Sequence, residues 1–213
     1  WTITPLPVRE DSRYTIRHGF GYSVFSHASH GIEQSMTQFV PVDKPVKISI
    51  LKFRNESPHR RNLTLAYYIR PVLGTSEQAA SMHIKTGLTD WGALTVENPY
   101  NEEFPGRIAF IDASPETRSV TGDRKEFFGA GGVRAPEALR RRKLSGTVGT
   151  GYEPCAAMQV DLALDIGEEK EIVLLFGMTS NVEDMKALAL RYRIVSHSKE
   201  ALIEVGKFWD ERL

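Results

Sequence analysis

The chain has 213 residues, of which 41% are hydrophobic and 25% are charged, and its 27 basic side chains balance its 27 acidic ones. This length fits one large domain or two small ones, and the balanced charge gives no electrostatic reason to expect nucleic acid or an anionic membrane as the main partner. The longest apolar run, at residues 172–178, is far shorter than the roughly 20 residues that a transmembrane helix needs.

The single cysteine of the chain, Cys155, excludes an internal disulfide and therefore a secreted disulfide scaffold, so a cytoplasmic setting is expected. It follows Pro154 at the start of an apolar segment, where a lone cysteine is typical of a small buried side chain rather than a thiolate nucleophile. No secretory leader pattern is visible. The sequence begins at Trp1 without a methionine, which we interpret as the sign of a piece of a longer protein.

Patterns typical of strands dominate the first half of the chain. The segment 46–55 has apolar side chains on both faces, which predicts a strand buried on both sides. The segment 62–74 alternates up to Pro71, which should end the ladder because proline has no N–H to donate. Shorter strands are predicted at 21–27, 93–98 and 107–113.

Two further strands are predicted late in the chain, at 157–165 and 170–178. The first alternates apolar and polar residues, and the short turn "IGEE" connects it to the second. We interpret the pair as a β-hairpin, although its turn is not of the tight Asn-Gly type.

The last part of the chain switches to helical spacing. Asn181 has the character of an N-cap, with Asp184 three residues later. A second helix is predicted after Ser198. The apolar stripes of the two helices are Met185, Leu188, Ala189 and Tyr192 in the first and Ala201, Leu202, Val205, Phe208 and Trp209 in the second. We expect both to pack on a sheet, and the second also to lead toward a further domain.

The segment between residues 114 and 155 gives no clear strand pattern and only one helix candidate, "APEALRRRKL" at 135–144. Loops of this length in a compact domain are usually functional or disordered. The stretch "VTGDRKEFFG", Val120 to Gly129, argues against disorder because disordered segments are poor in aromatic residues. The basic run "RRRK" at 140–143 is typical of a solvated helix face, with contact to a phosphate or an acidic domain as the alternative.

The sequence contains little evidence of known catalytic or metal-binding motifs. The histidines of "HASH", His27 and His30, are three residues apart, which in a strand points them to opposite faces, so a metal site is not expected. Neither the nucleophile elbow G-x-S-x-G nor a phosphate-binding P-loop occurs, and the glycine-rich stretches do not open a helix after a strand.

Polar and aromatic residues near predicted strand ends have the softer signature of sugar recognition, in which aromatic faces pack on pyranose rings and Asn, Asp and Arg bind hydroxyls. They fall in two segments, 89–107 and 121–129. The candidates are Trp91, Asn98, Tyr100, Asn101 and Arg107 in the first segment and Asp123, Arg124 and Phe128 in the second. Turn chemistry and aromatics that cover a sheet edge are the alternative explanation.

Several long blocks, taken together and in this order, resemble one known family. They include "RHGFGYSVFSHASHGIEQSMTQFVPVDKPVKISILKFRN", "NPYNEEFPGRIAF", "VTGDRKEFFG", "LSGTVGTGYEPCAAMQVDLAL" and "LLFGMTSNVEDMKAL". Over nearly the whole chain the sequence is similar to the β-sandwich domain of the cyclic β-1,2-glucan synthases, whose C-terminal part resembles the cellobiose and chitobiose phosphorylases.

This resemblance implies a mainly β fold, a two-sheet antiparallel supersandwich similar to galactose mutarotase, over residues 1–180. Residues 181–213 would be linker helices toward an (α/α)6 barrel that carries the catalytic acid. The resemblance therefore implies no catalytic residue, cofactor or metal in this chain. The implied partners are the covalently linked barrel and a β-glucan or oligosaccharide, with a homodimer possible, in a soluble cytoplasmic domain of a bacterial inner-membrane protein.

In that setting the segment 114–155 is expected to pack against the barrel and to wall its sugar subsites. Phe127 and Phe128 would bury against the barrel, while Asp123 and Arg124 would shape the site. Two other functions stay open. One is a mutarotase-type sugar epimerase, in which His18, His27 or His30 would supply an acid or a base. The other is a purely structural interaction module.

Overall fold

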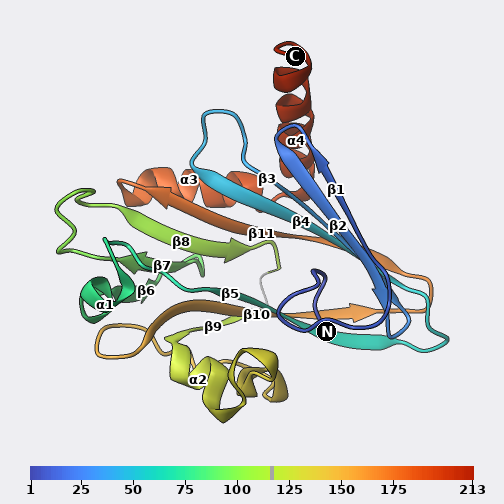
Figure 1. The fold of residues 1–213 in the computed structure, drawn as a ribbon, viewed down its shortest axis with the longest axis horizontal. Coiled ribbons are helices and arrows are strands. Elements are labelled where there is room, and N and C mark those ends of the chain that lie inside the picture. The colour runs from blue at the N-terminus through green and yellow to red at the C-terminus, as the bar shows by residue number, and fades with distance from the viewer. Residues whose placement is uncertain (116–117) are drawn as a thin grey trace.

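The computed structural model describes residues 1–115 and 118–213 and consists of two antiparallel β-sheets stacked face to face (Figure 1). Helices α3 (Val182–Tyr192) and α4 (Val195–Asp210) cover part of the outer face of the larger sheet. Short helices lie against the outer face of the smaller sheet, where α2 (Arg124–Phe128) is drawn at the bottom of the view. The mainly β, two-sheet architecture expected from the sequence is confirmed.

The larger sheet has eight strands, all paired antiparallel with their neighbours. In spatial order they are β1 (Tyr14–Gly19), β2 (Tyr22–Ser29), β3 (Ile32–Phe39), β4 (Val46–Asn55), β11 (Glu169–Thr179), β8 (Ile108–Ala113), β7 (Leu94–Glu97) and β6 (Lys85–Leu88). The smaller sheet has three strands, in the order β5 (Arg61–Ile69), β10 (Pro154–Leu164) and β9 (Arg118–Asp123). Helix α1 (Glu77–Ala80) and the 3-10 turn η1 (Ser81–His83) connect β5 to β6.

The main core fills the space between the two sheets, and β4 shows how one strand serves two cores. Its residues Leu51 and Phe53 face this main core. Ile48 and Ile50 point the other way, into a second core beneath α3 and α4. The sequence predicted this two-sided burial, and the structure confirms it. The cause is the central place of β4, with a sheet below it and helices above.

The predicted hairpin of residues 157–165 and 170–178 is wrong. Strand β10 pairs with β5 and β9, whereas β11 pairs with β4 and β8, so the turn between them crosses from one sheet to the other. Met158 of β10 and Leu174 of β11 both belong to the main core, and they reach it from different sheets. A short connection suits either geometry, because stacked sheets are also joined by tight corners.

The described residues of the segment 114–155, namely 114–115 and 118–155, contain more secondary structure than the sequence predicted. They include β9, α2 and the 3-10 turns η2 (Gly129–Arg134) and η3 (Glu137–Arg140). The prediction of an irregular loop here is therefore wrong. The helix expected at 135–144 is present only as the short 3-10 turn η3. Strand β9 escaped notice because it is short, polar and at the edge of its sheet, with Val120 as its contribution to the main core.

The helical end of the chain follows its sequence signals closely. The Asn181 side chain accepts a hydrogen bond from Asp184 N at 2.7 Å and so caps α3 as predicted. The apolar residues Met185, Ala189 and Tyr192 of α3 are buried in the core beneath the helices. Helix α4 begins at Val195, earlier than expected. None of the helices in the described ranges has the length and apolar character needed to cross a membrane.

Candidate functional site

A cavity of about 240 Å³ lies where the loop between β7 and β8 meets the chain after β5. Three of the side chains chosen from the sequence line it, namely Asn98, Asn101 and Arg107. Phe104 and Met178 line it as well. The structure thus brings one part of the predicted set together around a single hollow, which we call the 98–107 cavity.

The two asparagines of this cavity hold its loop in shape. Asn98 Nδ2 and Asn101 Nδ2 donate to the carbonyl oxygen of Leu73 at 2.8 and 3.2 Å. The Asn98 side chain accepts from Tyr100 N at 3.0 Å, and that of Asn101 accepts from Phe104 N at 3.2 Å. These bonds use most of the donors and acceptors of both amides. The asparagines therefore position the loop, and its other residues are the ones free to contact a ligand.

Exposed aromatic and charged side chains surround the cavity. Tyr100 is 72% exposed and Phe104 is 58% exposed. The Tyr100 ring lies 4.7 Å from the ring of His83, which supports it from one side. Arg107 is exposed and makes no hydrogen bond or ion pair with another residue in the described ranges. Sequence analysis missed Phe104, although Asn101 three residues before it carries the signal of a capped turn.

A second group of predicted residues gathers at α2. Asp123 caps this helix by accepting from Lys125 N at 2.9 Å. Arg124 lies over the ring of Phe128, 5.7 Å from its centroid, and its Nη1 is 3.5 Å from Glu153 Oε2. Phe127 is only 3% exposed. The expected role of Phe127 as a surface for a partner does not fit this placement, because its own domain already covers it.

Phe127 belongs to a third core on the outer face of the smaller sheet. Its ring lies 5.0 Å from that of Tyr68, and the other buried residues of the cluster are Ala138, Leu144, Cys155 and Ala157. Burial raises the pKa of the Cys155 thiol to about 12, with Asp123 and Glu126 acting in the same direction. The cysteine is therefore a packed apolar side chain, as its sequence context indicated, and not a thiolate.

Glu126 ties the basic segment that follows to α2. Burial opposes its ionisation, yet hydrogen bonds from Ser145 and Thr121 hold the pKa of the Glu126 carboxyl below its usual value. Ser145 N and Oγ donate to it at 2.8 and 2.6 Å. Arg141 Nη1 lies 3.9 Å away. The run 140–143 is otherwise exposed, as the sequence pattern favoured.

Trp91 lies apart from both groups, in the turn between β6 and β7. Lys186 of α3 places its Nζ 4.9 Å from the centre of the Trp91 ring. The Trp91 carbonyl oxygen accepts from Arg118 Nη2 at 2.5 Å and from Arg193 Nη2 at 3.0 Å. Trp91 therefore supports the start of the helical region, and the predicted site residues divide among these places.

Two of the three histidines considered as acid–base groups, His27 and His30, are bound within the domain, whereas His18 is exposed beside Ser23. His27 is buried between Ser12 Oγ, 2.6 Å from its Nε2, and Gln34 Nε2, 3.0 Å from its Nδ1. The Tyr14 ring stacks on it at 3.9 Å. His30 Nε2 lies 2.7 Å from Glu10 Oε1. These contacts fasten the N-terminal segment to β2 and β3.

The burial of His27 predicts a pH dependence of stability. Burial lowers the pKa of His27 below its usual 6.5, with Glu10 opposing that shift. As the pH falls below about 6.5, His27 therefore takes up a proton more readily in the unfolded chain than in the folded one. The free energy of unfolding then falls as the pH is lowered from 6.5 toward the pKa of the folded state. Urea midpoints measured from pH 7.5 downward should show the decline. The pKa of Glu10 is lowered by its hydrogen bond from Ser29, so its effect belongs to the more acidic range below 4.5.

The matched control for this dependence is an exposed histidine. His27→Gln should flatten the slope of stability against pH just below 6.5, whereas His59→Gln should leave it unchanged. An unaltered slope in the His27 variant would show that another group causes the decline.

The sequence matches one protein family and several longer proteins of known name. Over residues 1–195 the sequence matches the family described as "Glycosyl hydrolase 94, supersandwich domain". The cyclic beta-(1,2)-glucan synthase NdvB of Rhizobium meliloti is 30% identical, over 98% of this chain and 8% of that protein. The N,N'-diacetylchitobiose phosphorylase of Vibrio furnissii is 26% identical, over 100% of this chain and 27% of that protein. The chain thus spans less than a third of each of these relatives.

A solved structure shows the same fold. A bacterial glucoamylase complexed with acarbose superposes with a TM-score of 0.58 over 93% of this chain and 29% of the glucoamylase, at 9% identity. At this identity the likeness concerns the fold alone.

Proposed function

The chain belongs to the supersandwich-domain family of the glycosyl hydrolase 94 proteins, and on this premise we propose that it is a non-catalytic accessory domain of a carbohydrate-active enzyme. In this proposal a helical (α/α)6 barrel in the same protein carries out the chemistry on a β-glucan or related oligosaccharide. The supersandwich supports that barrel and contributes part of the wall of its sugar site. The whole protein would be a glycosyltransferase or a glycoside phosphorylase, as the names of its relatives suggest.

The observation that carries this proposal is the arrangement of the 98–107 cavity. Tyr100 and Phe104 expose their rings beside Arg107, while Asn98 and Asn101 hold the loop that bears them. Aromatic faces beside a guanidinium are suited to a pyranose ring and its hydroxyls, because the ring packs on the aromatic and the hydroxyls accept from the guanidinium. The loop is held before any ligand arrives, which lowers the entropic cost of binding.

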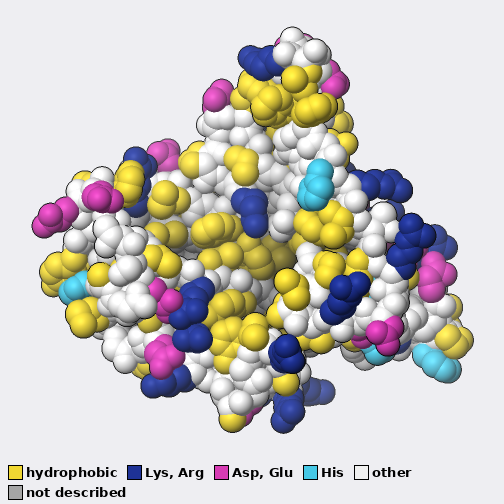
Figure 2. Space-filling model, in the orientation of Figure 1, with side chains coloured by type: hydrophobic (Ala, Val, Ile, Leu, Met, Phe, Trp, Pro, Cys, Tyr) yellow, Lys and Arg dark blue, Asp and Glu magenta, His cyan; other side chains and the backbone are white. Residues whose placement is uncertain are grey.

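The exposed apolar surface of α4 supports the second half of the proposal. Ile203 is 59% exposed and Trp209 is 36% exposed, and Phe20 from the turn between β1 and β2 packs beside Trp209. Figure 2 shows hydrophobic side chains gathered over the protruding C-terminal helix. Exposed apolar side chains that cluster in this way are typical of surfaces that another domain covers. We assign this surface to the barrel.

The sugar-site part of the proposal predicts a loss of activity without a loss of folding. Tyr100→Ala and Arg107→Ala, made in the full-length protein that carries this chain, should each lower kcat/KM for oligosaccharide by about tenfold or more, in line with a lost stacking contact or charged hydrogen bond. The thermal midpoint should change little because both side chains are exposed. Initial rates of oligosaccharide turnover would give the measurement.

The control for this experiment is Ile166→Ala, which removes an exposed side chain from the turn before β11, at the end of that strand opposite Met178 of the cavity. It should leave kcat/KM unchanged. Unaltered turnover in both cavity variants would favour a purely structural domain that supports the barrel without contacting sugar.

A further inference from the structure

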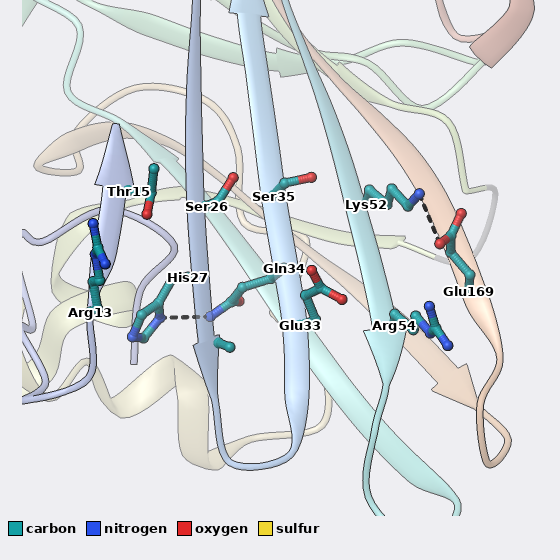
Figure 3. A pocket seen from close by; sticks show the side chains of 11 residues that line it. Arg13, Thr15, Ser26, His27, Glu33, Gln34, Ser35, Lys52, Arg54 and Glu169 are labelled. Carbon is teal, nitrogen blue, oxygen red and sulfur yellow. Dashed lines mark hydrogen bonds and ion pairs between the residues drawn. The ribbon is translucent and has the colours of Figure 1, made fainter. Parts of the chain in front are cut away.

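The outer face of the larger sheet carries a polar groove at the end away from α3. It has a volume of about 500 Å³ and is formed by β1, β2, β3, β4 and β11 together with Arg13 (Figure 3). The 98–107 cavity lies at the other end of the sheet, next to β7 and β8. The two sites are therefore separate, and the groove does not depend on the function proposed above.

The floor of the groove is a row of hydroxyl side chains on successive strands. Thr15 pairs with Ser26, Ser26 with Ser35, and Ser35 with Lys52, so all four side chains point to the same face. Figure 3 shows them side by side across the sheet. Adjacent strands lie about 4.8 Å apart, which is comparable to the length of one pyranose unit in an extended oligosaccharide. Groups that can donate and accept hydrogen bonds thus repeat at a spacing suited to a chain of sugars.

Charged side chains flank this row in nearly equal numbers of each sign. Lys52 Nζ binds Glu169 Oε2 at 2.8 Å, and Arg54 Nε binds Glu56 Oε1 at 2.7 Å. Arg13 and Glu33 also line the groove, and neither forms a hydrogen bond or ion pair with another residue of the described chain. The same is true of the hydroxyls in the row. The groove therefore offers unused donors and acceptors of both kinds.

This mixture selects for an uncharged, hydroxyl-rich ligand. A polyanion such as nucleic acid would meet Glu33 and Glu169 as well as the cations, and the repulsion would offset much of the attraction. An apolar ligand would leave the polar and charged side chains that line the groove without hydrogen-bond partners, since its lining, apart from Ala28, consists of polar and charged residues. Sugar hydroxyls both donate and accept, so they can satisfy arginine, glutamate and serine side chains at once.

We propose that this groove binds a neutral oligosaccharide, which lies across the strands with its hydroxyls on the Thr15, Ser26 and Ser35 row. Arg13 and Glu33 bind the ends of the bound segment as donor and acceptor. Lys199 of α4 reaches Glu171 Oε2 at 2.6 Å, and Glu171 pairs with Lys52 in the sheet, so α4 begins at the border of the groove. This binding site shares no residue with the 98–107 cavity.

The test is an amide-resolved NMR titration of the 213-residue chain with linear β-1,2-linked glucopentaose. We expect weak, millimolar binding, with shifts concentrated at Thr15, Ser26 and Ser35. The double variant Thr15→Val, Ser35→Ala removes two hydroxyls with little change in shape and should weaken binding by about tenfold. The matched control is Thr64→Val, which removes a hydroxyl from the outer face of the smaller sheet and should bind like the parent chain.

Three outcomes would overturn the proposal. One is the absence of shifts in the groove at the highest pentaose concentration, including the case in which shifts occur only around residues 98–107. Another is unchanged affinity in the double variant, provided its spectrum is that of a folded protein. The third is a response of the groove to inorganic phosphate without any response to pentaose, which would mark an anion site instead.

Discussion

Replacing Asp112 with alanine is expected to lower the free energy of unfolding by about 3–5 kcal/mol, the cost of breaking a buried ion pair by removing one partner. Asp112 is fully buried on β8. Its Oδ2 accepts from Arg193 Nε at 3.1 Å and Nη2 at 2.6 Å, and its Oδ1 lies 3.0 Å from Arg118 Nη1. Arg193 follows α3, and Arg118 begins β9. One carboxylate therefore joins the helices, the larger sheet and the strand before α2.

The measurement is urea unfolding of the variant beside the parent chain, followed by circular dichroism. Asp112→Asn keeps the shape but loses the charge and should fall between the two. The matched control is Asp161→Ala, which removes an exposed carboxylate that accepts one hydrogen bond from Thr64 at 3.0 Å. That control should cost less than about 1 kcal/mol. If Asp112→Ala lowered the free energy of unfolding by no more than the Asp161→Ala control, this carboxylate would not hold the domain together.

Phe127→Ala is expected to cost about 3–5 kcal/mol, the usual loss for a large aromatic removed from a packed core. The ring fills the third core, with Tyr68 on one side and Ala138, Leu144 and Cys155 around it. Its loss would leave a cavity beneath α2 and loosen Asp123 and Arg124 on that helix. The effect should therefore appear both in the unfolding midpoint and as faster hydrogen exchange in residues 124–134.

Phe128 provides the comparison for this prediction, because it neighbours Phe127 in the sequence but is only partly buried. Its ring lies 4.6 Å from that of Tyr68 and under the Arg124 guanidinium. Phe128→Ala should cost clearly less than Phe127→Ala. Equal losses for the two variants would mean that the third core does not anchor the helix.

Family and architecture were accessible from the sequence, and the family resemblance is confirmed by the match over residues 1–195. Strand β4 and the Asn181 cap were predicted correctly because each rests on local chemistry: alternation in a strand, and a side chain that accepts from the third residue after it. Such signals need no knowledge of what packs against the segment.

The pairing partners of the last two strands, β10 and β11, could not be predicted in the same way. The alternation in β10 and β11 fits a hairpin and a corner between sheets equally well. Only the partners of each strand, β5 and β9 for one and β4 and β8 for the other, decide between these arrangements. The prediction for the segment 114–155 was wrong for a related reason. Phe127 is buried through contact with residues distant in the sequence, Tyr68 among them.

The sequence identified several residues of the candidate site but not what each of them does. Asn98, Asn101 and Arg107 do line one cavity, but the two asparagines fix the loop, and the exposed Phe104 was missed. The hydroxyl row of the groove could not be chosen from the sequence, because Thr15, Ser26 and Ser35 become neighbours only through strand register.

The central claim is that this domain takes part in carbohydrate chemistry without performing it. The most direct test is one NMR time course of the 213-residue chain mixed with freshly dissolved glucose, β-1,2-glucopentaose and inorganic phosphate, which follows anomer exchange and phosphorolysis together. The account predicts that every signal changes at the rate seen in buffer alone. Turnover at about 1 per second or faster, the range of ordinary enzymes, would contradict it.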